Sequence, residues 1–413
     1  MDRRDVGFAG IMKFSSKYHN INRPRVGLYA LLAYPTISYI LSIYSVCWGV
    51  NDVAFGYAES FSCVEVLKNY YILIIQLISI IVGYFIFKNL LRAKKSSSKE
   101  KVYRLEERVM LLALQYIILL YFIISLYFFQ NSDAGFTPHL APRTLSTKSS
   151  QVLVMMATII SIIISNYKGI NILSKFNIMC IVVIFSWIEG SRTALIPLIV
   201  YTIYSMYNKK LLNVLTCFVL IIFVYNLSIS GRVAFDKGMW SFIDTLLNVA
   251  ESSVLLNFEY SYIFQFSYLH FMYTIDYADP VFSVSDLLFS IIPIPSSMHF
   301  IDADPDQWRI DIYRPFGGMA EIFTVGYFYY VMYNLIIGGI AGIIDKDDNK
   351  IFKTIAMGII IFAFVSSFQY GMRTVQWFIY GGVIVIVFYK ATHMLIYRRG
   401  RGMLGNSSDI YVP

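Results

Sequence analysis

Long apolar segments are the feature that most limits what this chain can fold into. About ten of them are long enough, or nearly so, to cross a hydrocarbon layer about 30 Å thick. They occupy residues 27–48, 69–91, 109–129, 150–166, 176–188, 193–208, 211–230, 317–344, 354–370 and 374–396. A composition with 57% hydrophobic and 15% charged residues excludes an ordinary soluble domain. We therefore predict an all-α, polytopic membrane protein with about 10 to 12 transmembrane helices.

The positions of Lys and Arg predict the orientation of these segments, because short basic loops stay on the cytoplasmic side. With alternating spans, both termini and most basic residues lie on one side, including seven basic residues from Arg92 to Arg108. Nine basic residues remain on the other side: Lys68, Arg143, Lys148, Arg192, Arg232, Lys237, Arg309, Arg314 and Arg373. We expect cytoplasmic termini, and we attribute the net charge of +8 to topology rather than to a nucleic-acid partner.

The four cysteines have no spacing that is typical of a metal site. Cys180 and Cys217 lie within apolar segments, whereas Cys47 and Cys63 bracket the first outer loop. Both a disulfide in an oxidising compartment and two free thiols fit this second pair.

The chain divides into three regions. Residues 1–230 form an N-terminal membrane bundle of about seven spans, residues 231–316 form one large periplasmic loop with interfacial helices, and residues 317–413 contain the last spans and a cytoplasmic tail. The loop holds eleven acidic and four basic residues, which gives a net charge of −7. Its arginines, Arg232, Arg309 and Arg314, therefore either neutralise neighbouring carboxylates or bind one particular anion.

Aromatic residues occupy every second position in part of this loop, at Phe258, Tyr260, Tyr262, Phe264, Phe266 and Tyr268. A period of two indicates a strand, but on a helix the same residues would surround the axis and suit the membrane interface. Packing at the interface is the simpler interpretation. The functional alternative is a platform on which sugar rings stack, with Tyr260, Tyr262 and Trp308 as candidate contacts.

Other polar residues of the loop have weaker signals. The acidic segment at residues 302–306 offers carboxylates that suit a hard divalent cation, but it lacks the glycine and distal glutamate of an EF-hand. A solvated turn at Pro305 explains it more simply, so no metal site is predicted. His270 and His299 are interpreted as structural or surface residues.

Residues 190–193 (Gly-Ser-Arg-Thr) join two short apolar stretches that either tilt or form a hairpin. Ser191 can cap the helix that follows, whose free N–H groups and positive dipole end favour an anion. Arg192 adds a bidentate guanidinium, and Arg232 lies at a matching depth at the end of a neighbouring span. We predict a phosphate site at these two arginines; the alternative is an arginine that snorkels to the interface.

The segment from Arg314 to Glu321 begins the eighth predicted span. Pro315 suits a first helical turn, and the glycines that follow allow close approach. Glu321 is then expected one to two turns into the bilayer, where a carboxylate is costly unless it is paired or faces water. Partial desolvation would raise its pKa and suit a general base acting on a hydroxyl. A structural salt bridge to Arg192, Arg314 or Arg373 is the alternative role.

Two motifs and the overall layout carry a resemblance to a known family. The layout is many spans with one dominant outer loop late in the chain, and the motifs are Gly-Ser-Arg-Thr-Ala-Leu at 190–195 and Phe-Gly-Gly-Met-Ala-Glu at 316–321, continuing to Gly326. In these features the chain resembles the bacterial O-antigen or oligosaccharide repeat-unit polymerases, the Wzy family. Some members carry arginine-to-glycine repeats in two outer loops, and this chain lacks that spacing.

The resemblance implies a GT-C-like glycosyltransferase that acts without metal or cofactor at the outer face of the bacterial inner membrane. Its substrates would be undecaprenyl-pyrophosphate-linked oligosaccharides in the membrane lipid, and a separate co-polymerase would set the chain length of the polysaccharide. Arg192 and Arg232 would hold the donor pyrophosphate, Glu321 would activate the acceptor, and Arg309 or Arg314 would hold the phosphates of the second lipid.

Two rival functions fit a similar layout. An O-antigen ligase has almost the same architecture, and its loop usually contains a functional histidine, for which His270 and His299 are the candidates. A lipid-linked oligosaccharide flippase would need a basic cavity between helix bundles, whereas the predicted spans here contain few Lys or Arg residues.

Overall fold

The computed structural model describes residues 25–48, 60–90, 105–128, 147–164, 171–189, 194–208, 210–233, 238–251, 268–276, 282–292, 309–311, 314–347, 349–368, 370–372, 375–376 and 379–380. The long helices are α1 (Val26–Cys47), α3 (Tyr70–Leu90), α4 (Leu105–Phe128), α5 (Thr147–Ile164), α6 (Asn171–Glu189), α7 (Leu195–Tyr207), α8 (Leu211–Val233), α13 (Tyr327–Lys346) and α14 (Lys350–Ser366). The shorter elements are α2 (Cys63–Lys68), α9 (Met239–Glu251), a helix at 268–276, α11 (Val284–Ile291), β1 (Arg309–Asp311), β2 (Arg314–Pro315) and α12 (Gly318–Val325).

Several of these helices are long and apolar enough to cross a membrane. Within the described residues there are five such segments, at Val26–Cys47, Cys63–Asn89, Arg108–Tyr127, Leu211–Ser228 and Tyr327–Lys346. Three shorter apolar helices, at Val152–Ile164, Ile172–Ile188 and Leu195–Tyr207, accompany them. The structure is therefore consistent with the predicted polytopic membrane protein.

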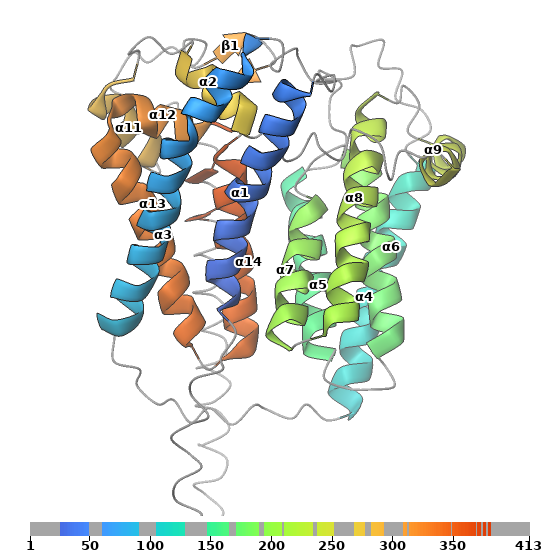
Figure 1. The fold of residues 1–413 in the computed structure, drawn as a ribbon. Coiled ribbons are helices and arrows are strands. Elements are labelled where there is room, and N and C mark those ends of the chain that lie inside the picture. Colours follow the sequence, from blue (N-terminus) through green and yellow to red (C-terminus); the bar gives the residue numbers. More distant parts are fainter. Residues whose placement is uncertain are drawn as a thin grey trace, which may run out of the picture.

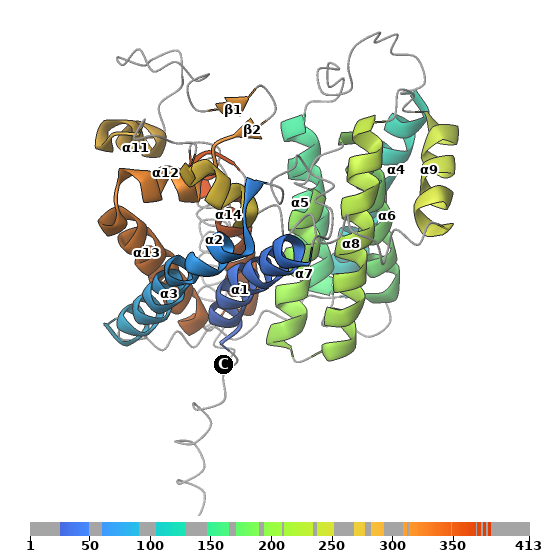
Figure 2. The same cartoon turned by 45° about the horizontal axis from the view of Figure 1, so that its top comes forward.

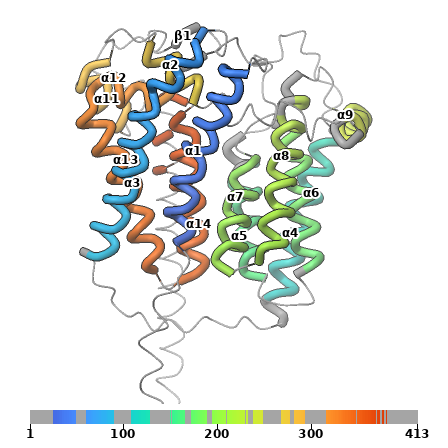
Figure 3. Tube along the Cα trace, in the orientation of Figure 1, coloured from blue at the N-terminus to red at the C-terminus, as the bar shows by residue number. Residues whose placement is uncertain are grey.

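The helices pack as two groups that do not follow chain order. One group buries side chains from α1, α3, α13, α14 and the helix at 268–276 around a common core, and the other buries side chains from α4, α5, α6, α7 and α8, with α9 against it. Figures 1 and 2 show the two groups side by side, and Figure 3 shows the first helices of the chain lying among the last ones.

Glycines allow the closest helix pair, α3 and α13, to approach through backbone contact. A Cβ atom at Gly83 would lie 2.0 Å from the carbonyl oxygen of Leu335, and one at Gly338 would lie 2.2 Å from that of Ile80. Small residues at such positions are the usual means of packing helices inside a membrane, where lipid is as apolar as the helix surface. The pair lies within the buried core of the first group.

The two groups meet where α7 lies along α14. Ile162, Val200 and Tyr204 form a small buried cluster there, against which Ile351 at the start of α14 packs. Gly358 of α14 faces Val200 so closely that a Cβ atom would lie 2.4 Å from the Val200 Cγ2 atom. The junction is apolar along these residues.

A polar cluster also joins the groups, at the end of α13 remote from α12. The buried carboxylate of Asp345 accepts a hydrogen bond from the Tyr84 hydroxyl on α3 (2.8 Å) and another from the Tyr207 hydroxyl on α7 (2.5 Å). Lys88 donates to the Tyr84 hydroxyl (3.1 Å), and the Lys353 ammonium lies 5.0 Å from the centroid of the Tyr207 ring. One carboxylate thus links helices of both groups.

The eighth predicted span is not one helix, which corrects the expectation for residues 317–344. The chain breaks at Gly326, between α12 and α13, with φ +150° and ψ +152°. An L side chain rarely adopts this backbone conformation, so a glycine is needed there. Glu321 consequently lies on the separate short helix α12, outside the candidate membrane span that begins at Tyr327.

The described fold is helical, as predicted, apart from one short β-ribbon. Strands β1 and β2 pair in antiparallel fashion, with Arg309 opposite Pro315 and Asp311 opposite Arg314. The ribbon directly precedes α12, and Figure 1 places β1 at the end of the molecule that also carries α2 and α12. The described fold is otherwise helical.

Candidate functional site

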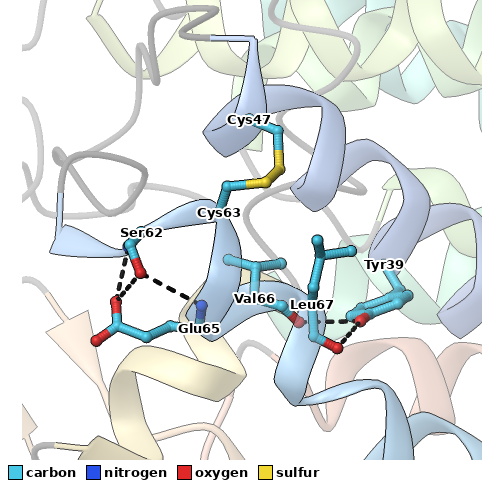
Figure 4. Close-up of a disulfide and its surroundings, with 7 residues drawn as sticks. All are labelled: Tyr39, Cys47, Ser62, Cys63, Glu65, Val66 and Leu67. Atoms are coloured by element: carbon cyan, nitrogen blue, oxygen red, sulfur yellow. Dashed lines mark hydrogen bonds between the residues drawn. A yellow bond between two sulfur atoms is a disulfide. The ribbon is translucent and has the colours of Figure 1, made fainter.

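A disulfide marks one end of the helix bundle. Cys47 at the end of α1 is bonded to Cys63 at the start of α2 (Figure 4), so the structure selects the disulfide over two free thiols. Ser62 and Glu65 form a capping box at the start of α2: the Ser62 N–H donates to the Glu65 carboxylate (2.7 Å), and the Glu65 N–H donates to the Ser62 hydroxyl (3.3 Å). The Tyr39 hydroxyl donates to the carbonyl of Val66 (2.9 Å) and holds α2 against α1.

The helix at 268–276 packs against α1 and the α2 region. The Asn69 side-chain amide donates to the Met272 sulfur (3.4 Å), and the rings of Tyr39 and Tyr268 meet edge to face with centroids 5.0 Å apart. The Phe61 and Tyr273 rings make a similar contact at 6.4 Å. The middle of the large loop is therefore integrated into the first helix group.

The C-terminal turn at residues 367–372 binds the first turn of α12. The Gly318 N–H donates to the Tyr370 carbonyl (2.9 Å), and the Met319 N–H donates to the Ser367 carbonyl (2.8 Å). These N–H groups would otherwise be available to an anion at the helix N-terminus. Here carbonyl oxygens of the chain occupy them, so this helix start is a docking point for the turn.

Glu321 makes the reciprocal contact with the same turn. Its side chain is only 4% exposed, and its Oε2 atom accepts a hydrogen bond from the Met372 N–H (2.9 Å). A Cβ atom at Gly371 would lie 2.8 Å from the Glu321 Oε1 atom, so a glycine is needed beside the carboxylate. Two backbone–backbone hydrogen bonds and one from the Met372 N–H to the Glu321 carboxylate thus connect α12 and the turn.

Burial dominates the electrostatics of this carboxyl group. It raises the pKa of Glu321 to about 7, and the hydrogen bond from the Met372 N–H opposes that shift. A carboxylate with a pKa near neutrality can both accept and release a proton at physiological pH. Chemically, the group is suited to take a proton from a hydroxyl.

His270 lies next to the start of α12. It is fully buried, and a Cβ atom at Gly317 would lie 3.5 Å from the His270 Cδ2 atom and 2.5 Å from the Phe368 carbonyl oxygen. The structure therefore brings the loop histidine, the helix of Glu321 and the C-terminal turn together. The sequence placed His270 in the loop but contained no signal for this contact.

Two buried hydroxyl groups lie in the aromatic core near His270. The Tyr268 and Tyr330 side chains are fully buried, and their hydroxyls have no hydrogen-bond partner within the part of the chain that the structure describes. Phe271 connects them, with ring centroids 5.6 Å from Tyr268 and 6.1 Å from Tyr330. Buried hydroxyls are usually satisfied, so these two are unusual polar groups in an otherwise aromatic core.

The structure describes some of the arginines predicted to bind phosphate, but not all of them. Arg232 lies in the last turn of α8, in the second helix group, whereas Arg309 and Arg314 lie on the paired strands that precede α12. Arg192, Tyr260, Tyr262, Trp308 and His299, and the acidic segment 302–306, lie outside the described residues. The ribbon brings two of the predicted arginine positions together; it does not include Arg232.

The turn at 367–372 is the part of the site that sequence analysis missed. The turn lies at the junction of two predicted spans, 354–370 and 374–396, where the apolar pattern is interrupted at Ser366, Ser367, Gln369, Gly371 and Arg373. That interruption indicates a turn, but no pattern in the sequence indicates that it binds α12.

Among the described residues, no three His, Cys, Asp or Glu side chains are grouped to hold a metal ion. No family model, no curated protein and no solved structure matches this chain.

Proposed function

We propose that this protein polymerises undecaprenyl-pyrophosphate-linked oligosaccharide repeat units into O-antigen or a related surface polysaccharide. The observation that carries the proposal is the buried Glu321 carboxyl group, with a pKa near 7, on a short helix at the end of the bundle that bears the disulfide. Glycosyl transfer from a lipid pyrophosphate needs a base at the acceptor hydroxyl and cations at the departing pyrophosphate. The buried glutamate supplies the first of these requirements.

The disulfide supports an outward position for this site. Disulfides form in oxidising compartments, so the Cys47–Cys63 end of the bundle faces the periplasm in a bacterial cell. That assignment agrees with the excess of Lys and Arg in the predicted cytoplasmic segments and with cytoplasmic termini. We propose a GT-C-like enzyme of the inner membrane with about ten spans.

The proposed roles of the arginines follow from their charge. Arg192 and Arg232 hold the donor pyrophosphate, while Arg309 or Arg314 holds the phosphates of the acceptor lipid. The pairing of β1 with β2 supports the second assignment, because it puts two arginine positions on one ribbon beside the start of α12. Tyr260, Tyr262 and Trp308 are the proposed sugar contacts, and a separate co-polymerase determines chain length.

Ligation of finished O-antigen is the second candidate function. The contact of His270 with the start of α12 favours it, because a ligase of similar layout would use a loop histidine close to its acceptor site. Both candidate functions place the chemistry at the same end of the bundle. They differ in the acceptor that receives the glycan.

The surface glycan of a deletion strain separates the two functions. Loss of a polymerase leaves lipid A–core capped by a single repeat, whereas loss of a ligase leaves uncapped core and accumulated long polymer. Accumulation of inward-facing single repeats would instead indicate a flippase. We expect single-repeat caps, and uncapped core would contradict the proposal.

Complementation of the deletion strain then tests whether Glu321 acts as the base. Glu321→Gln, expressed at the wild-type level, should not restore long chains because an amide cannot accept the proton. Asp244→Asn on α9 is the matched control, since Asp244 is an exposed acid outside the site. Equal restoration by both variants would show that Glu321 is not the base.

A further inference from the structure

Helix α11 exposes an apolar stripe although it lies outside the candidate spans. Val284, Leu288, Ile291 and Ile292 are exposed by 41%, 54%, 40% and 47%, and their spacing puts them on one side of the helix. Ser285 and the capping residues Ser283 and Asp286 supply the polar positions near its N-terminus. Leu287 and Phe289 on the other side of the helix are buried, so α11 packs on the protein by one apolar side and leaves a second apolar side uncovered by the described part of the chain.

The helix is too short to cross a bilayer. Eight residues span about 12 Å, whereas the hydrocarbon core is about 30 Å thick. It packs beside α12 at the end of the bundle that carries the disulfide (Figures 1 and 2). An apolar helix of this length at the end of a membrane bundle fits the boundary between head groups and acyl chains.

Side chains at both ends of α11 contact neighbouring segments of the chain. At the N-terminal end, Phe282 meets Phe316 edge to face with ring centroids 5.3 Å apart, and both pack against Val325. At the C-terminal end, the Tyr380 hydroxyl donates to the Ile291 carbonyl (2.5 Å). Val325 is the last residue of α12, and Gly326 alone separates it from the candidate span α13.

The first turn of that span also exposes aromatic side chains. Tyr327 and Phe328 are exposed by 51% and 69% at the start of α13, where a membrane protein presents aromatic side chains to the interface. A second protein is less suited than lipid to cover the apolar side of α11, because a stable protein interface needs about 20 to 30 residues from each partner. Four aliphatic side chains are too few for such an interface.

We propose that α11 lies in the surface of the membrane, with Val284, Leu288, Ile291 and Ile292 covered by the acyl chains of the adjacent leaflet. The contacts of Phe282, two residues before α11, with Phe316 and Val325 then hold α12 at the level of the lipid head groups. This placement does not depend on the proposed enzymatic activity. It follows from the apolar stripe, the length of the helix and its attachments.

Site-directed spin labelling of the full chain in lipid vesicles tests the proposal. Cys180 and Cys217 are replaced by alanine, and the disulfide is kept. A nitroxide is then attached at Leu288→Cys or, as the control on the opposite side of the same helix, at the partly exposed Asp286→Cys. We expect the label at position 288 to collide more often with oxygen, which concentrates in the acyl region, than with a water-soluble nickel chelate. The label at position 286 should show the reverse preference.

Two results would overturn the proposal. Equal access of the nickel chelate to both positions would place α11 in water. An immobilised label at position 288 that neither reagent reaches would show that protein covers the stripe. Ile292→Cys repeats the measurement at a second stripe position, so that local disturbance by one label does not decide the outcome.

Discussion

Glu321 is the residue whose role depends most on its surroundings. The sequence singled it out because a carboxylate near a predicted span is costly. The structure places it on α12 and gives it the Met372 N–H as a hydrogen-bond donor. No sequence pattern predicts that partner, because the contact joins residues far apart in the chain through the backbone of a turn.

The stability of the protein should depend on pH through Glu321. Its folded-state pKa of about 7 lies above the ordinary value of 4.5, so the folded state binds this proton more tightly than the unfolded state does. The resulting stabilisation is complete below the ordinary pKa and is lost as the pH rises through about 7, by about 3 kcal/mol. Glu321→Gln cannot titrate, so its stability relative to wild type should increase over that range. Thermal unfolding in detergent between pH 4.5 and 7.5 measures the difference; parallel profiles would contradict the assigned pKa.

Gly371→Ala should disturb the Glu321 carboxylate directly. The added Cβ atom would lie 2.8 Å from the Glu321 Oε1 atom, and relief of that overlap should cost about 1–3 kcal/mol of unfolding free energy. In a Glu321→Ala background the obstructing oxygen is absent, so the same substitution should cost at least about 0.5 kcal/mol less. Additive costs in a double-mutant cycle would show that residue 371 does not act through the carboxylate.

At the scale of elements, the lengths of the apolar segments predicted the long helices well. The predicted spans at 27–48, 69–91 and 109–129 correspond to α1, α3 and α4 within a few residues. The predicted span at residues 317–344 was wrong at Gly326. The sequence stays apolar around this residue, but its backbone conformation ends the helix. The short ribbon was also missed, since two or three residues of strand leave no recognisable period.

The disulfide should stabilise α2 and the helix at residues 268–276 that packs against this region. It closes a loop with a sequence separation of 16, and removal of such a cross-link typically costs about 3 kcal/mol. The double substitution Cys47→Ser/Cys63→Ser should therefore lower stability and raise hydrogen exchange in residues 268–276, which pack against Tyr39 and Asn69. Cys180→Ala is the control, because Cys180 is a free thiol. Unchanged exchange in 268–276 would show that the disulfide is not needed to hold this contact.

At the scale of the whole molecule, the packing order of the helices could not be read from the sequence. Apolar spans of similar length are interchangeable in a hydropathy pattern, so no pattern indicates that α1 and α3 pack with α13 and α14. The glycines of α13 are compatible with a close helix contact, but nothing in the sequence identifies α3 as the partner helix. The outward position of the loop and the division of charge across the membrane remain predictions from Lys and Arg placement.

The link between the two helix groups should weaken when Tyr207 loses its hydroxyl. Tyr207→Phe removes a hydrogen bond to the buried Asp345 carboxylate, and loss of a bond to a charged group typically costs about 1.5–3 kcal/mol. Tyr201→Phe on the same helix is the control, because the Tyr201 ring contacts Tyr204 rather than the cluster. Chemical unfolding of both variants in detergent makes the comparison, and an equal effect of the two substitutions would rule out Asp345 as the link.

Reconstitution with a defined substrate is the decisive test of the proposed polymerase activity. The purified protein is placed in vesicles whose only glycan is an undecaprenyl-pyrophosphate-linked repeat unit, and the lipid-linked products are separated by size. We expect products of two or more repeats from wild type and none from Glu321→Gln. Transfer that occurs only after lipid A–core acceptor is added, or polymer formation by Glu321→Gln at the wild-type rate, would contradict it.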